Sequence, residues 1–133
     1  MILADTSVWI DYFNGSITPH TDTLDAALFA GTVAIADLIF LEILQGFKND
    51  KDYAKARDRL AKLDQYSIFS SEMVEQCAEN YRALRKKGIT IRKTNDVIIA
   101  TYCIKHQIPL LYIDRDFNPF VKHLGLVSAC AKT

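Results

Sequence analysis

Short runs with the character of strands alternate with helical segments along this sequence, and this alternation constrains the fold more than any other feature. The runs are residues 1–4, 33–36, 67–70 and 110–113. Strands that alternate with helices predict a parallel sheet covered on both faces. We therefore expect an α/β fold with a central parallel sheet of four or five short strands, the fifth being Leu126–Val127.

Length and composition predict one globular unit. We expect a single domain over residues 1–133, because chains of this length usually form one domain. No apolar run approaches the ~20 residues of a membrane span, and no signal-peptide pattern begins the sequence. We therefore expect a cytoplasmic protein with no membrane partner. Its three widely spaced cysteines indicate reduced thiols rather than disulfides or zinc ligands.

Polar residues and glycines mark the expected helix ends. The N-cap candidates are Thr6 or Ser7, Asp37, Ser70 or Ser71, and Thr94. Pro19 is suited to the first position of a helix, and Gly31 and Gly88 are suited to close helices in the left-handed conformation. A short helix is expected near residues 119–123, before the last apolar run.

Acidic residues follow two predicted strands and lie early in two predicted helices. Asp5 follows the first strand and Asp114 the fourth, so both should lie at the sheet edge where sites form. Asp96 falls in a first helical turn, Glu42 lies about one and a half turns into another helix, and Asp116 is a fifth candidate. Clustered carboxylates repel, and Mg²⁺ or Mn²⁺ would remove that repulsion.

Each acid also has an ordinary structural interpretation. Asp5 could cap the helix that follows it, and Asp96 could simply stabilise its helix by ~0.3–1 kcal/mol through the dipole. Glu42 shares a helical arc with Gln45 and Asn49, which favours a solvated face. Residues 114–116 could form an acidic turn. Position alone leaves both interpretations open.

The ordered set of motifs resembles PIN-domain ribonucleases, most closely the VapC-type toxins of bacterial toxin–antitoxin pairs. The motifs are Asp5-Thr6-Ser7, Leu41 to Gly46 around Glu42, Asn95 to Ala100 around Asp96, and Asp114-Arg115-Asp116-Phe117. The resemblance covers essentially the whole chain. It implies a metal-dependent endoribonuclease toxin that cleaves RNA by a metal-activated water, forms a homodimer and is neutralised by a cognate antitoxin.

The resemblance also implies roles for single residues. The expected catalytic acids are Asp5, Glu42, Asp96 and Asp114, of which Asp5, Asp96 and Asp114 would hold Mg²⁺ or Mn²⁺. The expected supporting residues are Thr6, Ser7, Asn95 and Asp116. Thr6, or its neighbour Ser7, would hold the first acid or a metal-bound water.

One concentrated basic stretch precedes Asp96. Its candidate RNA-binding residues are Arg85, Lys86, Lys87, Arg92 and Lys93. The formal net charge is zero, so RNA binding would need such a local patch, whose phosphate contacts would not read bases. We expect replacement of Arg92 and Lys93 to leave metal binding unchanged. A solvated helix end or an antitoxin contact is the alternative.

Other functions fit less well. A PIN nuclease of RNA processing that is not a toxin remains open. A receiver-like module with an acidic pocket would need an aspartate at the end of a middle strand and a late lysine, and a phosphatase would not need Asp5 or Glu42. The aromatic residues Trp9, Tyr12, Phe13, Phe40 and Phe47 are expected in the core, some of them lining a groove for an antitoxin helix.

Overall fold

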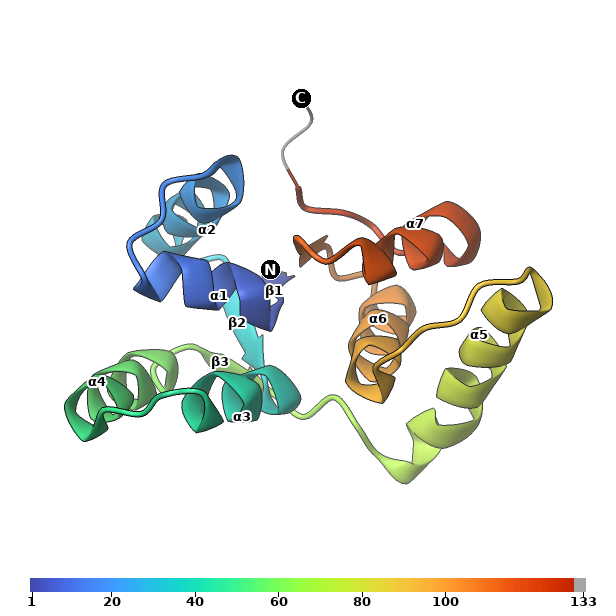
Figure 1. Ribbon diagram of the computed structural model, residues 1–133, viewed down its shortest axis with the longest axis horizontal. Coiled ribbons are helices and arrows are strands. Elements are labelled where there is room, and N and C mark those ends of the chain that lie inside the picture. Colours follow the sequence, from blue (N-terminus) through green and yellow to red (C-terminus); the bar gives the residue numbers. More distant parts are fainter. Residues whose placement is uncertain (131–133) are drawn as a thin grey trace.

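Short parallel strands form the centre of the molecule in the computed structural model, which describes residues 1–130 (Figure 1). The strands are β1 (Ile2–Ala4), β2 (Val33–Ala36), β3 (Asp64–Tyr66) and β4 (Leu110–Leu111). The sheet order is β3-β2-β1-β4, and each neighbouring pair is parallel. The predicted α/β fold with a parallel sheet of short strands is confirmed.

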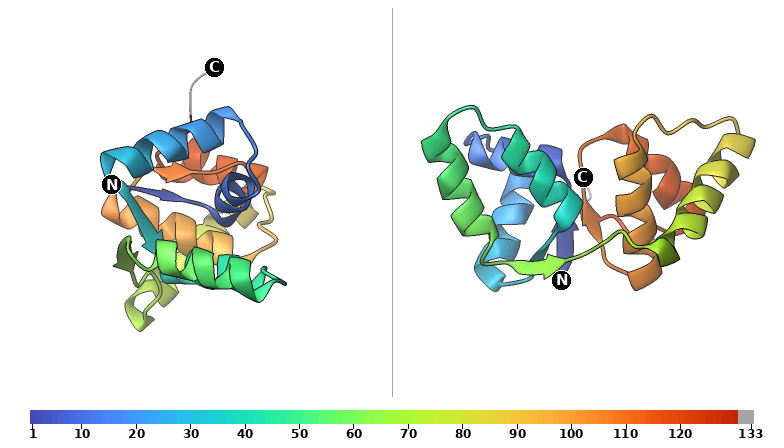
Figure 2. Two further views of the ribbon diagram at one scale, coloured as in Figure 1. Left: turned by 90° about the vertical axis from the view of Figure 1, so that its left-hand side faces the viewer. Right: turned by 90° about the horizontal axis from the view of Figure 1, so that it is seen from below.

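Helices cover the sheet on two sides. They are α1 (Thr6–Phe13), α2 (Pro19–Ala30), α3 (Asp37–Gln45), α4 (Asp50–Leu60), α5 (Val74–Lys86), α6 (Thr94–His106) and α7 (Asn118–Leu124), with 3-10 turns η1 (Ser71–Met73) and η2 (Arg115–Phe117). Helices α1 to α4 lie on one side of the central strands and α5 to α7 on the other (Figures 1 and 2). Both faces of β2 and β4 are buried as a result, which explains their uninterrupted apolar sequences. Across residues 1–130, no helix is both long and apolar enough to span a bilayer.

The third strand lies earlier than predicted. It is Asp64–Tyr66, whereas residues 67–70 follow an irregular path. β3 pairs only with β2 at one edge of the sheet, and Asp64 and Gln65 are exposed, so this strand carries no apolar signal in the sequence. Ile68 is buried, but its amide donates to the Asp37 carboxylate at 3.2 Å instead of to a strand.

The strands at the other edge are shorter than predicted. β4 stops at Leu111. The Leu111 carbonyl accepts a hydrogen bond from the amide of Asp5, the residue directly after β1. Leu126–Val127 does not form a fifth strand. The chain there makes only an isolated parallel bridge between Leu110 and Ser128.

The predicted N-caps of three helices are wrong by one or two residues, because the caps of α1, α3 and α6 are Asp5, Ala36 and Lys93. Ser70 is the N-cap of the 3-10 turn η1 without a side-chain cap bond, and Met73 is the N-cap of α5. The hydroxyl groups of Thr6 and Ser7 bond to carboxylates instead of to helix amides. The predicted helix starts and ends at Pro19, Gly31 and Gly88 are confirmed, and the two glycines have φ of +71° and +83°.

Candidate active site

The carboxyl ends of β1 and β4 form the part of the sheet edge where acidic groups gather. From β1 the chain passes through α1 and α2 to β2, whereas β4 lies on the opposite flank of β1. Sites in parallel α/β sheets usually form at the carboxyl ends of the strands, at the point where the strand order reverses. The Asp5 amide donates to the Leu111 carbonyl at 2.8 Å, which holds Asp5 beside the end of β4.

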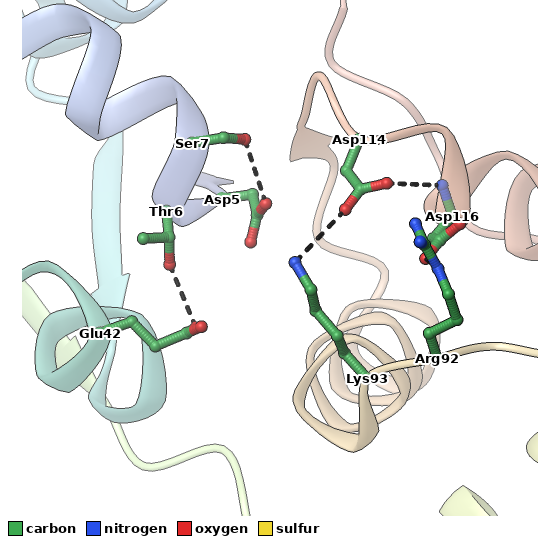
Figure 3. Close-up of polar contacts among 8 residues, drawn as sticks. All are labelled: Asp5, Thr6, Ser7, Glu42, Arg92, Lys93, Asp114 and Asp116. Atoms are coloured by element: carbon green, nitrogen blue, oxygen red, sulfur yellow. Dashed lines mark hydrogen bonds and ion pairs between the residues drawn. The ribbon is translucent and has the colours of Figure 1, made fainter.

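Five predicted carboxylates meet at this edge. Oxygen atoms of Asp96, Asp114 and Asp116 all lie within 4.8 Å of one another. Asp5 and Glu42 lie on the side of α1 and α3, across from Asp114 and Asp116 (Figure 3). The structure therefore brings together residues from α3, α6 and the ends of β1 and β4, although their chemical roles remain predictions.

The two most buried of these carboxyl groups, Asp5 and Asp96, have raised pKa values. The pKa of Asp5 is raised to about 6, chiefly by burial and also by the charges of Glu42 and Asp114, while hydrogen bonds from Thr6 and Ser7 lower it. Burial raises the pKa of Asp96 to about 7, with added repulsion from Asp5 and partial compensation by Lys93. Repulsion between these groups is the signature expected of acids that share a site.

Two hydroxyl groups at the start of α1 orient two of the acids. The Thr6 hydroxyl donates to Glu42 Oε1 at 3.1 Å, and the Ser7 hydroxyl donates to Asp5 Oδ2 at 3.4 Å (Figure 3). The sequence left open whether Thr6 or Ser7 holds the first acid, and this geometry assigns that contact to Ser7. Glu42 is half-buried and bonded rather than part of a solvated face. Asn95 is half-buried at the start of α6, and its supporting role remains a prediction.

The basic stretch divides into two parts. Arg85, Lys86 and Lys87 are exposed at the end of α5, and Arg85 lies over the Tyr81 ring. In contrast, Arg92 Nε lies 3.4 Å from Asp116 Oδ2 and Lys93 Nζ lies 3.8 Å from Asp114 Oδ2.

The sequence predicts that replacement of Arg92 and Lys93 leaves metal binding unchanged, because neither residue is an expected metal ligand, and this stays a prediction. The ion pairs place both side chains against candidate metal-site acids, which is a physical reason to revise it. A signal was available in the sequence. Lys93 stands only three residues before Asp96 at the predicted start of a helix, and residues three apart in a helix are neighbours on its surface.

The donor atoms fit a divalent cation that prefers oxygen. Asp96 Oδ2 is buried, and no residue in the described range donates a hydrogen bond to it. A buried oxygen of this kind is costly unless a ligand or a proton satisfies it. Oxygen ligands of this type suit Mg²⁺ or Mn²⁺ better than softer metals.

An apolar hollow lies between α1 and α3. It has a volume of about 200 Å³ and is lined by Ile10, Phe13, Asn14, Ile43, Gly46 and Phe47. Trp9 is buried as predicted and stacks on Phe13, whose ring also contacts Phe47. The aromatic residues thus form part of the core and also reach the surface.

Known proteins are similar to this chain in sequence. Residues 2–121 match the PIN domain family. VapC ribonuclease Mb1587 of Mycobacterium bovis and ribonuclease VapC11 of Mycobacterium tuberculosis are each 30% identical over 97% of this chain and 98% of their own.

Solved structures show the same fold. A chain of the VapBC2 complex of Rickettsia felis, bound to a DNA fragment from its promoter, has a TM-score of 0.75 at 20% identity, covering 99% of this chain and all of that chain. A toxin–antitoxin complex from Klebsiella pneumoniae has a TM-score of 0.68 at 23% identity, covering 96% and 97%. From the family match and the relatives at this identity and coverage, the chain belongs to the PIN domain family, among the VapC ribonucleases.

Proposed function

We propose that this protein is a Mg²⁺- or Mn²⁺-dependent endoribonuclease and the toxin of a toxin–antitoxin pair. The observation that carries the proposal is the acidic group at Asp96. Its carboxylate lies with those of Asp114 and Asp116, burial and the charges of Asp5 and Glu42 raise its pKa, and its buried Oδ2 receives no hydrogen bond from residues 1–130. Its relatives are named as ribonucleases, which agrees with this chemistry. The functional unit proposed is a single domain over residues 1–133.

The proposed mechanism divides the work among the acids. Asp5, Asp96 and Asp114 would hold the ion, with Asp116 and Asn95 in support. A bound divalent ion makes water a better nucleophile at neutral pH and offsets charge that develops on the phosphate. Glu42, oriented by the Thr6 hydroxyl, would accept a proton from the attacking water. Ser7 would keep Asp5 in position through its hydrogen bond.

The proposed protein partner is a cognate antitoxin. The comparison structures come from complexes described as toxin–antitoxin or VapBC assemblies. The apolar hollow between α1 and α3 offers Phe13 and Phe47 to an apolar segment of such a partner. A homodimer is proposed from the family resemblance, and Leu41, Phe69 and Val74 are large apolar residues exposed in the single chain.

Asp96→Asn tests the enzymatic proposal. The amide keeps the shape of the side chain and removes its charge, so we expect RNA cleavage with Mn²⁺ to fall by at least about a hundredfold. The assay maps new RNA 5′ ends made by purified protein. Asp58→Asn, an equivalent change at an exposed residue of α4, is the control and should cleave normally. Wild-type cleavage by the Asp96→Asn protein, free of contaminating nuclease, would refute the site.

Toxicity is tested separately from catalysis. Expression of the wild-type chain should arrest growth, and expression of the Asp96→Asn chain should not. An active nuclease that leaves growth unaffected would instead support a role in RNA processing.

A further inference from the structure

Both oxygens of the Asp114 carboxylate already have partners within the chain. The Asp116 amide donates to Oδ1 at 2.9 Å, and Lys93 Nζ lies 3.8 Å from Oδ2. Arg92 Nε pairs in the same way with Asp116 Oδ2 at 3.4 Å. Two cations from the loop between α5 and α6 therefore lie against two acids of the proposed metal site (Figure 3).

The two sides of these ion pairs differ in their freedom to move. The Arg92 and Lys93 side chains are 75% and 63% exposed, whereas the Asp116 and Asp114 side chains are 20% and 25% exposed. Asp114 is also fixed by the Asp116 amide, since Asp114 is the N-cap of the 3-10 turn η2 and Asp116 lies within that turn. When such a pair separates, the long exposed cation moves and the acid stays in place.

A divalent ion and these cations are rivals for the same oxygens. An ion bound to Asp114 would place two like charges against one carboxylate, and the resulting repulsion would weaken the contact with Lys93. The same reasoning holds for Arg92 at Asp116. Because the cations are mobile, their departure relieves the repulsion without moving the acids.

We propose that Arg92 and Lys93 are positioning residues that exchange partners. Arg92 and Lys93 pair with Asp116 and Asp114 until a divalent ion binds these carboxylates. The two side chains then contact the phosphates of the RNA strand beside the site. Ion binding thereby creates part of the RNA-binding surface. The second half of this proposal rests on the proposed function, whereas the competition with the ion does not.

Mn²⁺ affinity tests the competition. Because the variant lacks two exposed ion pairs that compete with the ion, Arg92→Gln/Lys93→Gln should bind Mn²⁺ roughly twofold to thirtyfold more tightly than wild type in calorimetry. Lys86→Gln/Lys87→Gln removes equal charge from the same basic stretch without touching the acids, and should bind Mn²⁺ less than twofold more tightly. Arg92→Lys/Lys93→Arg keeps both charges and should behave as wild type. Unchanged or weaker Mn²⁺ binding by the Gln variant would overturn the proposal.

The salt dependence of RNA binding tests the exchange. The probe is a short single-stranded oligoribonucleotide with linkages that resist cleavage, measured with Mn²⁺ and with a chelator. With Mn²⁺, Arg92→Gln/Lys93→Gln should flatten the slope of log K against log salt by about 0.7–1.4, one ~0.7 step per phosphate contact. With chelator its slope should equal that of wild type. Equal flattening of the slope with Mn²⁺ and with chelator would overturn the exchange of partners. Absence of RNA binding by the wild-type protein would refute the proposed substrate. In that case the Mn²⁺ titration would still decide whether the cations compete with the ion.

Discussion

Asp5 and Asp96 are the site residues on which the surrounding protein acts most strongly. Their exposed fractions are 7% and 5%, and burial raises their pKa values to about 6 and about 7. The ordinary value is 3.8, which is close to that of the unfolded chain. Ionising either group therefore costs more in the folded protein than in the unfolded chain.

The stability of the metal-free protein should fall as pH rises. Both carboxyl groups have raised pKa values, so the folded state binds more protons than the unfolded state between about pH 4 and pH 7. Their contribution to stability is complete below the unfolded pKa and is lost as pH passes the folded values. We expect a loss of several kcal/mol, because a difference of one in pKa corresponds to about 1.4 kcal/mol, and urea unfolding with a chelator present measures it.

The variant Asp5→Asn/Asp96→Asn isolates this effect. Its amides do not ionise, so its free energy of unfolding should change less over the same pH range and should exceed that of wild type near pH 7. Parallel profiles for the two proteins would show that other groups control the pH dependence.

At the scale of elements, α6 positions Asp96 by packing against α5. The Asn80 amide on α5 donates to the Thr101 hydroxyl on α6 at 3.0 Å, and both residues are buried. Gln76 donates in turn to Asn80 at 3.0 Å. Thr101 lies five residues after Asp96 on the same helix, so this contact fixes how α6 presents the acid.

Asn80→Ala should destabilise the protein by about 1–3 kcal/mol, because it removes one partner of a buried polar pair. Thr101→Val should lower the free energy of unfolding less in the Asn80→Ala protein than in wild type, since the hydrogen bond is already absent from the Asn80→Ala protein. Denaturant unfolding of the two single variants and the double variant measures this coupling, expected near 1 kcal/mol. Simple additivity would mean that the hydrogen bond contributes nothing measurable.

The sequence predicted elements and acids better than it predicted partners. Apolar runs revealed β1, β2 and β4 because their faces are buried, and acids at the ends of β1 and β4 could be assigned to one sheet edge. β3 escaped detection because an exposed edge strand has no apolar pattern.

Contacts between distant elements could not be read from local pattern. The bond from Thr6 to Glu42 joins residues 36 positions apart, and the pairing of Arg92 with Asp116 joins residues 24 apart. The first depends on how α1 and α3 approach one another, and the second on how the loop between α5 and α6 approaches η2. Local sequence fixes where a carboxylate lies along an element, and tertiary packing fixes which group it meets.

For the whole molecule, a divalent ion should act as a stabilising ligand of the folded state. The acids come from five separate positions, so the unfolded chain cannot bind the ion in the same way. At a hundredfold excess over its Kd, Mn²⁺ should contribute about 2.7 kcal/mol and raise the Tm by roughly 10 °C. Differential scanning fluorimetry measures this shift.

The Asp5→Asn/Asp114→Asn variant provides the control. It should fold, since it relieves repulsion between carboxylates, but its Tm should not respond to Mn²⁺. A shift as large as that of wild type would place the ion elsewhere on the protein.

The order of the sheet has a consequence for how the chain is made. β4 is the last strand in sequence and lies beside β1, which is the first. Asp5 leaves the ribosome early but meets Asp114 and Asp116 only after β4 and the residues that follow it have emerged. A nascent or truncated chain that ends before β4 therefore lacks the assembled site.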